Sequence, residues 1–265
     1  MTRRITVGIG RELYNALFNP SQFVRARTSS YTQTNVGTFV EVNRLVVVYV
    51  LNLLMYAIPL TLAGVGVQKS QPAPAWFEAS VFAALADADA LWQFLTALLE
   101  NCSFITVALV ITLLNYHVAM ALSLNSKGIL QTLHTVVYTT SAYLAAIFTL
   151  VMYLSTSPAI EVADEIVINV QKSFFYFFID ATGSGLALPS GRPEPVVMAN
   201  LTQEGKLAIA GLVISLLYYL YSLYLGARLN HETTRSGALL VIAAVGAAPA
   251  IYVVGIIFAN INGMI

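Results

Sequence analysis

The hydrophobic residues of this 265-residue chain gather into five long runs separated by more polar segments. A helix needs about 20 apolar residues to cross the hydrocarbon core of a bilayer. Each run reaches that length without an Asp, Glu, Lys or Arg, and the runs cover residues 45–67, 102–124, 129–154, 207–227 and 237–259. Because backbone amides in lipid must find partners within their own segment, these runs predict five transmembrane helices.

Three further segments are apolar but too short or too charged to span. Residues 5–18 place their apolar side chains on one helical face and end before Pro20, a pattern that predicts an interfacial helix. Residues 76–100 either lie in the outer interface or extend the second span outward. Residues 159–179 end in a run of aromatic side chains that suits the headgroup boundary.

The predicted fold is therefore an all-α integral membrane protein, a bundle of about five transmembrane helices with flanking interfacial amphipathic helices. Residues 1–44 are expected to form a cytoplasmic N-terminal segment that contains the first interfacial helix. Residues 45–265 are expected to form the transmembrane domain. Only 10% of all residues are charged, against roughly 25% in soluble domains, which agrees with a lipid environment.

The charges are unevenly distributed between the two sides of the predicted spans. Residues 1–44, 125–128 and 228–236 together hold nine basic and three acidic residues. Cytoplasmic segments are enriched in Lys and Arg. We therefore expect a cytoplasmic N-terminus and, with an odd number of spans, an external C-terminus. The net charge of zero argues against a nucleic-acid partner, which would require a clustered basic patch.

Two histidines lie inside the predicted spans. His117 and His134 flank the turn at Lys127-Gly128 at similar distances, so they are expected at similar depth and could face each other. An axial ligand of haem or of a chlorophyll-type pigment, or a proton relay, is one interpretation. The other is that each ring hydrogen-bonds a neighbouring hydroxyl or carbonyl group, or extends toward the cytoplasmic interface.

No pattern typical of catalysis is present. The sequence lacks a phosphate-binding loop, a hydrolase motif, a Ser/His/Asp arrangement and a metal-binding cluster, so we expect no catalytic residues, no metal and no enzymatic activity. The five spans also lack the carboxylate that an ion-coupled transporter usually needs. Glu100 lies just before the second span and is interpreted as an interface charge, with a transport gate as the alternative.

The fifth predicted span is rich in small residues. Gly246 with Ala250, and Gly255 with Ala259, form two pairs of small residues four positions apart. Such pairs allow helix backbones to approach closely, so these residues are the expected helix-packing interface. The pattern leaves open whether the partner helix belongs to this chain or to another one.

Several motifs occur in a recognisable order around the spans. Phe18-Asn19-Pro20 precedes the first span, Tyr116-His117 ends the second, and Gly226-Ala227-Arg228 ends the fourth. This order resembles prokaryotic members of the Yip1 family of five-pass membrane proteins. The family's proline after the third-span tyrosine is replaced by Ser141-Ala142, and its glycine pair in the second turn by Asn125-Ser126.

The resemblance implies a fold and little chemistry. The long N-terminal region that eukaryotic members present to Rab GTPases is absent, so a Rab-type partner is not implied. We expect a non-catalytic Yip1-like organiser, or an accessory or scaffold subunit of a larger complex, in contact with lipid and with other membrane protein chains. No cofactor is expected. A small-solute transporter or channel is one alternative, and a subunit that binds haem or pigment through His117 or His134 is a second.

Overall fold

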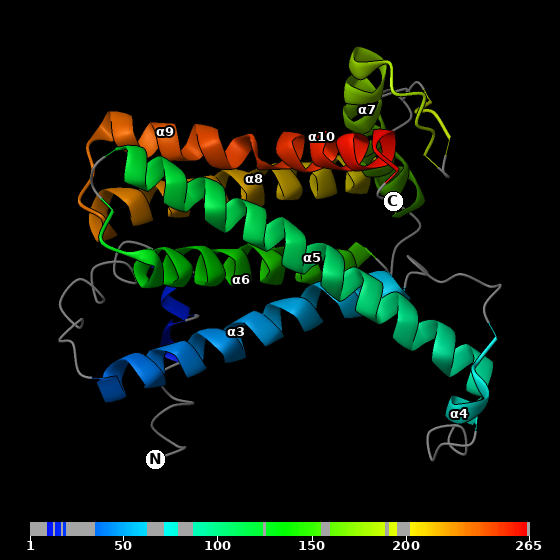
Figure 1. Cartoon of the computed structure of the whole chain (residues 1–265), viewed down its shortest axis with the longest axis horizontal. Coiled ribbons are helices and arrows are strands. Elements are labelled where there is room, and N and C mark those ends of the chain that lie inside the picture. The colour runs from blue at the N-terminus through cyan, green and yellow to red at the C-terminus, as the bar shows by residue number, and fades with distance from the viewer. Residues whose placement is uncertain are drawn as a thin grey trace.

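The chain forms an elongated bundle of helices in the computed structural model (Figure 1). The structure describes residues 10–12, 14–16, 18–19, 35–62, 72–78, 87–123, 126–154, 160–188, 191–194 and 202–263. Within these ranges every regular element is a helix: α3 (Asn35–Leu62), α4 (Ala75–Glu78), α5 (Ala88–Leu122), α6 (Ile129–Leu154), α7 (Ile160–Thr182), α8 (Gln203–Leu225), η2 (Gly226–Asn230), α9 (Arg235–Gly246) and α10 (Ala248–Ile261). The all-α prediction is confirmed.

Within the described residues, four stretches of helix are long and apolar enough to cross a membrane. They are residues 38–59 of α3, all of α5, α8 together with η2, and α9 together with α10. These stretches confirm a multi-pass integral membrane protein. The third predicted span, 129–154, coincides with helix α6, and its passage through the bilayer stays a prediction.

Helix α5 differs most from its predicted span. It begins at Ala88 rather than at residue 102, because no helix-breaking residue intervenes and Asp87 caps its first turn by accepting a hydrogen bond from the backbone N–H of Asp89. Residues 88–100 therefore extend the helix outward, the second of the two alternatives for that segment. At about 1.5 Å per residue, α5 exceeds the roughly 30 Å core of a bilayer, and it runs obliquely across the bundle (Figure 1).

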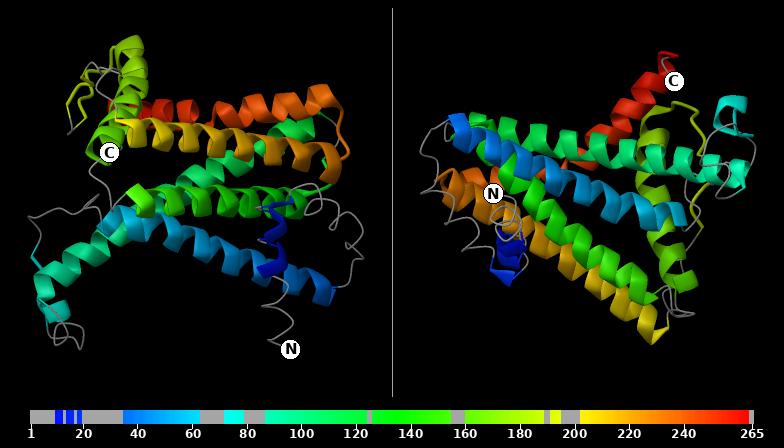
Figure 2. Two further views of the ribbon diagram at one scale, coloured as in Figure 1. Left: turned by 180° about the vertical axis from the view of Figure 1, so that it is seen from behind. Right: turned by 90° about the horizontal axis from the view of Figure 1, so that it is seen from below.

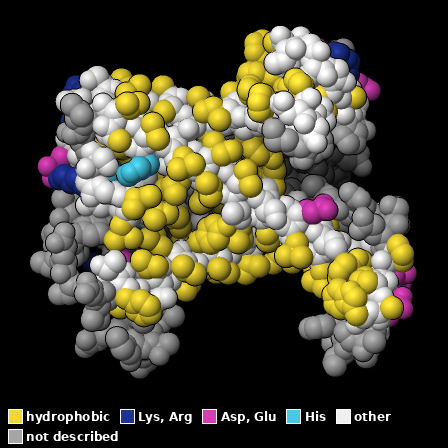
Figure 3. Space-filling view, viewed as in Figure 1, with side chains coloured by type: hydrophobic (Ala, Val, Ile, Leu, Met, Phe, Trp, Pro, Cys, Tyr) yellow, Lys and Arg dark blue, Asp and Glu magenta, His cyan; other side chains and the backbone are white. Residues whose placement is uncertain are grey.

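The helices pack in two groups that share α5 and α6. Helix α3 packs on α5 and α6, whereas α8 packs on α6 and α9 packs on α5. Between α3 and α6, the Asn52 side-chain amide donates to the carbonyl oxygen of Val137 at 3.0 Å. Large apolar side chains such as Leu54, Val107 and Ile214 point outward, and apolar side chains dominate the middle of the face shown in Figure 3. This surface suits lipid and would be costly in water.

The described part of the N-terminal segment is helical at residues 10–12, 14–16 and 18 and runs across the bundle helices (Figures 1 and 2). That orientation is the one expected of an interfacial helix; residues 5–9 lie outside the described residues. The segment is also fixed to the bundle. Ala16 is buried beside Leu45 and Tyr138, and the Tyr138 hydroxyl donates to Glu12 Oε2 at 2.6 Å.

Helix α3 begins ten residues before the predicted boundary at residue 45, and Arg44 is the charge that made the sequence suggest a boundary there. Arg44 forms ion pairs with Glu12 at 3.4 Å and with Glu41 at 3.3 Å, which compensate its charge inside the helix.

Helix α7 crosses the opposite end of the bundle, near the ends of α8 and α10 (Figure 2). We call the end with residues 126–128 and 231–234 the inner end, and the end with α4 and α7 the outer end.

Candidate functional site

Buried polar side chains gather at the inner end of the bundle, where the last turn of α8 widens into the π-helix η2. Such widened turns occur often at functional sites. A Cβ atom at Gly226 would overlap the Thr135 Cγ2 methyl of α6 and lie 3.2 Å from the Tyr116 hydroxyl of α5. Glycine at this position therefore lets η2 approach α5 and α6 closely. We call the group Tyr116, His117, Thr132, Thr135, Asn230 and His231 the inner polar cluster.

Asn230 connects η2 to α6. Its side-chain amide donates to Thr135 Oγ1 at 3.1 Å and to the carbonyl oxygen of Gln131 at 3.4 Å. The Asn230 Oδ1 and Gln131 Oε1 atoms are buried and accept no hydrogen bond from the described residues. Two buried acceptors are therefore left for hydrogen bonds from water.

His231 is the first residue of the loop between η2 and α9 and is almost fully buried, with 1% of its surface exposed. The backbone N–H of Lys127 donates to His231 Nδ1 at 3.2 Å, so in the neutral ring the proton sits on Nε2. Burial, together with the smaller effects of the neighbouring His117 and Lys127 charges, lowers the pKa of His231 to about 4. His231 is therefore neutral near pH 7.

The two histidines predicted as candidate ligands have different neighbours. His117 Nδ1 lies 3.2 Å from Thr132 Oγ1, within hydrogen-bonding distance, and its ring lies near enough to His231 to affect the pKa of that residue. His134 is 3% exposed and packs on the Tyr138 ring with centroids 4.6 Å apart. Tyr138 in turn contacts Glu12 of the N-terminal segment. Haem or pigment ligation by either ring stays a prediction.

Sequence reasoning missed His231 as a member of this cluster. It stands in a short polar loop, and neither hydropathy nor spacing indicates burial there. Within the described residues, no group of three or more His, Cys, Asp or Glu side chains is arranged to hold a metal ion.

The small residues of the fifth predicted span lie on the outside of the bundle. Gly246 and Gly255 are exposed, and a Cβ atom at either would meet nothing within 4 Å. Ala250 and Ala259 are half-buried. We call these four residues the small-residue face. Close packing by glycine within the chain occurs instead at Gly226 and at Gly237, where a Cβ would overlap the Thr233 hydroxyl.

A groove of about 420 Å³ runs between α5 and α10, toward the outer end of the bundle. Its lining is apolar apart from two hydroxyls and one carboxylate, and consists of Leu99, Glu100, Ser103, Phe104, Val107 and Tyr252. Phe104 and Tyr252 meet edge to face, with ring centroids 5.6 Å apart, and form its floor. Glu100 lies inside helix α5, which extends beyond the predicted second span, and its interpretation as an interface charge stays a prediction.

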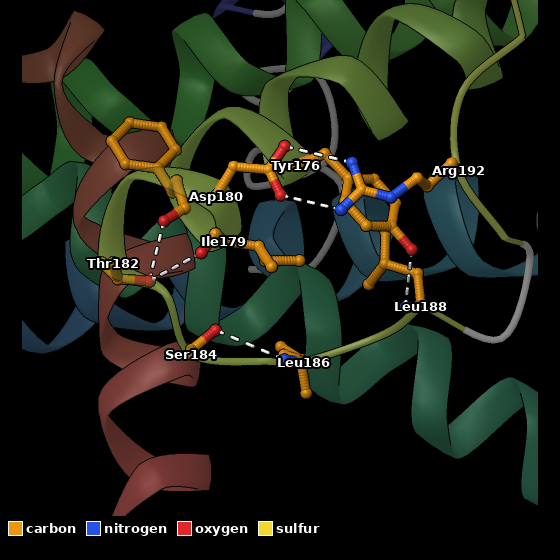
Figure 4. A network of polar contacts seen from close by, with 9 residues as sticks. Tyr176, Ile179, Asp180, Thr182, Ser184, Leu186, Leu188 and Arg192 are labelled. Carbon is orange, nitrogen blue, oxygen red and sulfur yellow. Dashed lines mark hydrogen bonds and ion pairs between the residues drawn. The ribbon is translucent and has the colours of Figure 1, made fainter.

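A second concavity, of about 550 Å³, lies beside α7 and the loop that follows it. Asp180, Arg192 and Tyr176 point toward one another there (Figure 4). The Arg192 guanidinium donates to both Asp180 carboxylate oxygens, at 2.9 and 3.1 Å, and lies 4.7 Å from the Tyr176 ring centroid. These hydrogen bonds lower the pKa of Asp180 and keep it ionised. The charged groups satisfy each other, which indicates a loop anchor rather than a ligand site.

Comparison with protein-family models, with curated proteins and with solved structures finds no match for this chain.

Proposed function

We propose that this chain is a non-catalytic membrane subunit, a Yip1-like organiser or an accessory component of a larger complex, that acts by binding other membrane protein chains. The observation that carries the proposal is the outward position of the small-residue face. Sequence alone left its partner undecided between this chain and another one. Because the space beside Gly246 and Gly255 is open, this chain's described helices do not fill it.

In lipid, the forces that hold helices together differ from those in water. Lipid tails are as apolar as leucine, so helices associate through close van der Waals contact and hydrogen bonds rather than through the hydrophobic effect. A surface without bulky side chains lets a second backbone approach closely. Helix α10 begins just after Ala247 with Pro249 in its first turn, so the Gly246/Ala250 pair lies at the junction of α9 and α10 and the Gly255/Ala259 pair lies within α10.

The test is replacement of Gly246 by Leu in the tagged, full-length protein extracted gently from its native membrane. The added side chain should release co-purifying chains while the protein still inserts and melts like the wild type. Ala210→Leu is the matched control, because Ala210 is an exposed small residue on α8. If the Gly246→Leu variant retains the same co-purifying chains as the wild type, the proposal is refuted. A large drop in its melting temperature would show that the face packs within the chain.

A small-solute transporter or channel is the second candidate, and the position of Glu100 favours it. The sequence placed no carboxylate inside a span, whereas the structure places Glu100 within the 35-residue apolar helix α5. Ionisable groups inside membranes often mark ion or proton pathways. Flux measurements on vesicles containing the purified protein, with Glu100→Gln as comparison, decide between the two candidates.

A further inference from the structure

The groove between α5 and α10 presents one carboxylate on an otherwise uncharged surface. Glu100 is exposed in it, between Leu99 and Ser103 and one helical turn from Phe104. Its carboxylate makes no hydrogen bond or ion pair with the part of the chain that the structure describes. A carboxylate of this kind needs either water or a partner of opposite charge.

The aromatic side chains around α4 indicate that Glu100 lies below the outer membrane boundary. Trp76, Phe77 and Trp92 form a cluster with ring centroids 5.1 to 5.8 Å apart, typical of the aromatic belt at headgroup level. Glu100 follows Trp92 by eight residues on the same helix, about 12 Å toward the inner end.

The contacts that α5 makes with helices α10 and α3 near Glu100 also indicate the depth of Glu100 in the membrane. Tyr252 contacts Phe104, and α10 continues beyond Tyr252 with apolar residues until Asn260. On the other side of α5, Asn101 donates to Thr61 of α3 at 3.0 Å. Thr61 lies 17 residues from the Arg44 ion pairs, about 26 Å along a helix and less than the roughly 30 Å core. The apolar stretch of α3 ends at Pro59, two residues before Thr61, so Glu100 lies at the outer edge of that core.

We propose that the groove receives a transmembrane helix of a partner protein, and that this helix carries a Lys or Arg side chain at the depth of Glu100. A charged group in lipid is costly, and an opposite charge on a neighbouring helix is the usual compensation. The exposed Gly255 lies three residues from Tyr252 on the same side of α10, so a helix in the groove can also make close backbone contact there. This inference rests on the proposed function and specifies the chemistry of the partner.

A second copy of this chain is a poor occupant of the groove. Dimers of identical chains usually have two-fold symmetry, in which the same surface patch meets itself. A two-fold contact centred on Glu100 would bring two carboxylates together. Charge complementarity thus favours a different chain with a basic residue.

The experiment uses the purified full-length protein in phosphatidylcholine vesicles and a fluorescent transmembrane peptide of Leu and Ala as the probe. One peptide carries a single Lys in its outer third, and the control peptide carries Leu there. Energy transfer should show roughly tenfold tighter association of the Lys peptide with the wild-type protein, the size expected of a polar contact between helices. Glu100→Gln should reduce association to that of the Leu peptide, whereas Glu78→Gln, an exposed carboxylate of α4, should not.

A charge exchange guards against indirect effects of the substitution. Glu100→Lys should prefer a peptide that carries Glu in place of Lys. Equal association of Lys and Leu peptides with the wild-type protein overturns the inference, as does an unchanged preference in Glu100→Gln. A dimer that dissociates in Glu100→Gln, or an ion flux that Glu100→Gln abolishes, overturns it in favour of a second copy or of transport.

The two proposals fail in different ways. If Gly246→Leu releases native partners while the Lys peptide shows no preference for Glu100, the proposed function stands and this inference falls. If native partners remain bound to Gly246→Leu and the peptide preference is present, the interaction surface is the groove rather than the small-residue face.

Discussion

The two ends of the bundle are built in different ways. At the inner end, η2, α5 and α6 approach so closely that only glycine fits at position 226, and polar groups such as Asn230 and His231 are almost completely buried. At the outer end, α5 leans away from its neighbours, the groove beside α10 is open, and Glu100 is exposed. The comparison indicates that the inner end holds the fold together and the outer end is available for contacts with other molecules.

The largest difference should be in accessibility to water-soluble reagents from the two sides of the membrane. In a background with Cys102→Ala, Ser236→Cys at the inner end should react only from the cytoplasm, and Thr182→Cys at the outer end only from outside, because the basic residues flank the inner end. Both positions are exposed. Impermeant maleimide labelling of intact cells measures this, and reaction of both from one side would contradict the predicted orientation.

Acid should weaken the inner end through His231. The folded protein lowers the pKa of His231 to about 4 from an ordinary value of 6.5, so between these values the unfolded chain binds more protons. The contribution of neutral His231 to the free energy of unfolding is therefore fully present above pH 6.5. It is lost as the pH drops to about 4, which lowers the free energy of unfolding by at most about 3 kcal/mol. Thermal unfolding in detergent as a function of pH measures this loss.

The control for that titration is His231→Gln, which keeps an acceptor for the Lys127 amide and cannot be protonated. Its stability should depend less on pH in this range than that of the wild type. An identical acid dependence in both proteins would assign the effect to other groups.

Close packing at the inner end predicts that Gly226→Ala lowers stability by about 2 kcal/mol, because the new methyl group overlaps the Thr135 methyl. Thr135→Ser removes that methyl and keeps the hydroxyl that accepts from Asn230, so the double variant should recover part of the loss. Gly246→Ala, with open space around it, should melt within a degree or two of the wild type. Equal losses at both glycines would remove the contrast between tight and open surfaces.

The smallest expected effect concerns the histidine pair. His117→Ala should cost about 1 kcal/mol, the contribution of its hydrogen bond with Thr132. Neither His117→Ala nor His134→Ala should change the visible absorption of the purified protein. Loss of an absorption band in either variant would instead place a haem or pigment at that ring and bring the cofactor-binding hypothesis forward.

The hydrophobic pattern predicted the membrane class and the helical character of each long apolar run. It placed the start of α5 at residue 102, fourteen residues late, because Asp89 and Glu100 interrupt the hydropathy while the helix continues through them. It placed the start of α3 late because the ion pairs that compensate Arg44 depend on Glu12, 32 residues away. Charge compensation across the fold is not visible in a local window of sequence.

The candidate surfaces were harder to predict than the helices. Small residues four positions apart identify a face on which close approach is possible, but they do not say whether a neighbour is there. Gly246 and Gly255 fit the pattern and remain open, whereas Gly226 and Gly237, which stand at helix ends, are tightly packed. The burial of His231 depends on a π-helix turn, and propensity gives no signal for that turn.

The docking of the N-terminal segment sets an order for biosynthesis. Glu12 receives its hydrogen bond from Tyr138, 126 residues later in the chain, and the Ala16 carbonyl is contacted by Tyr218, 202 residues later. At roughly 5 to 20 residues per second, the ribosome needs about 6 to 25 s to add the first of these partners. During that interval the N-terminal segment has no α6 to bind, so its contact with Tyr138 forms only after α6 has been made.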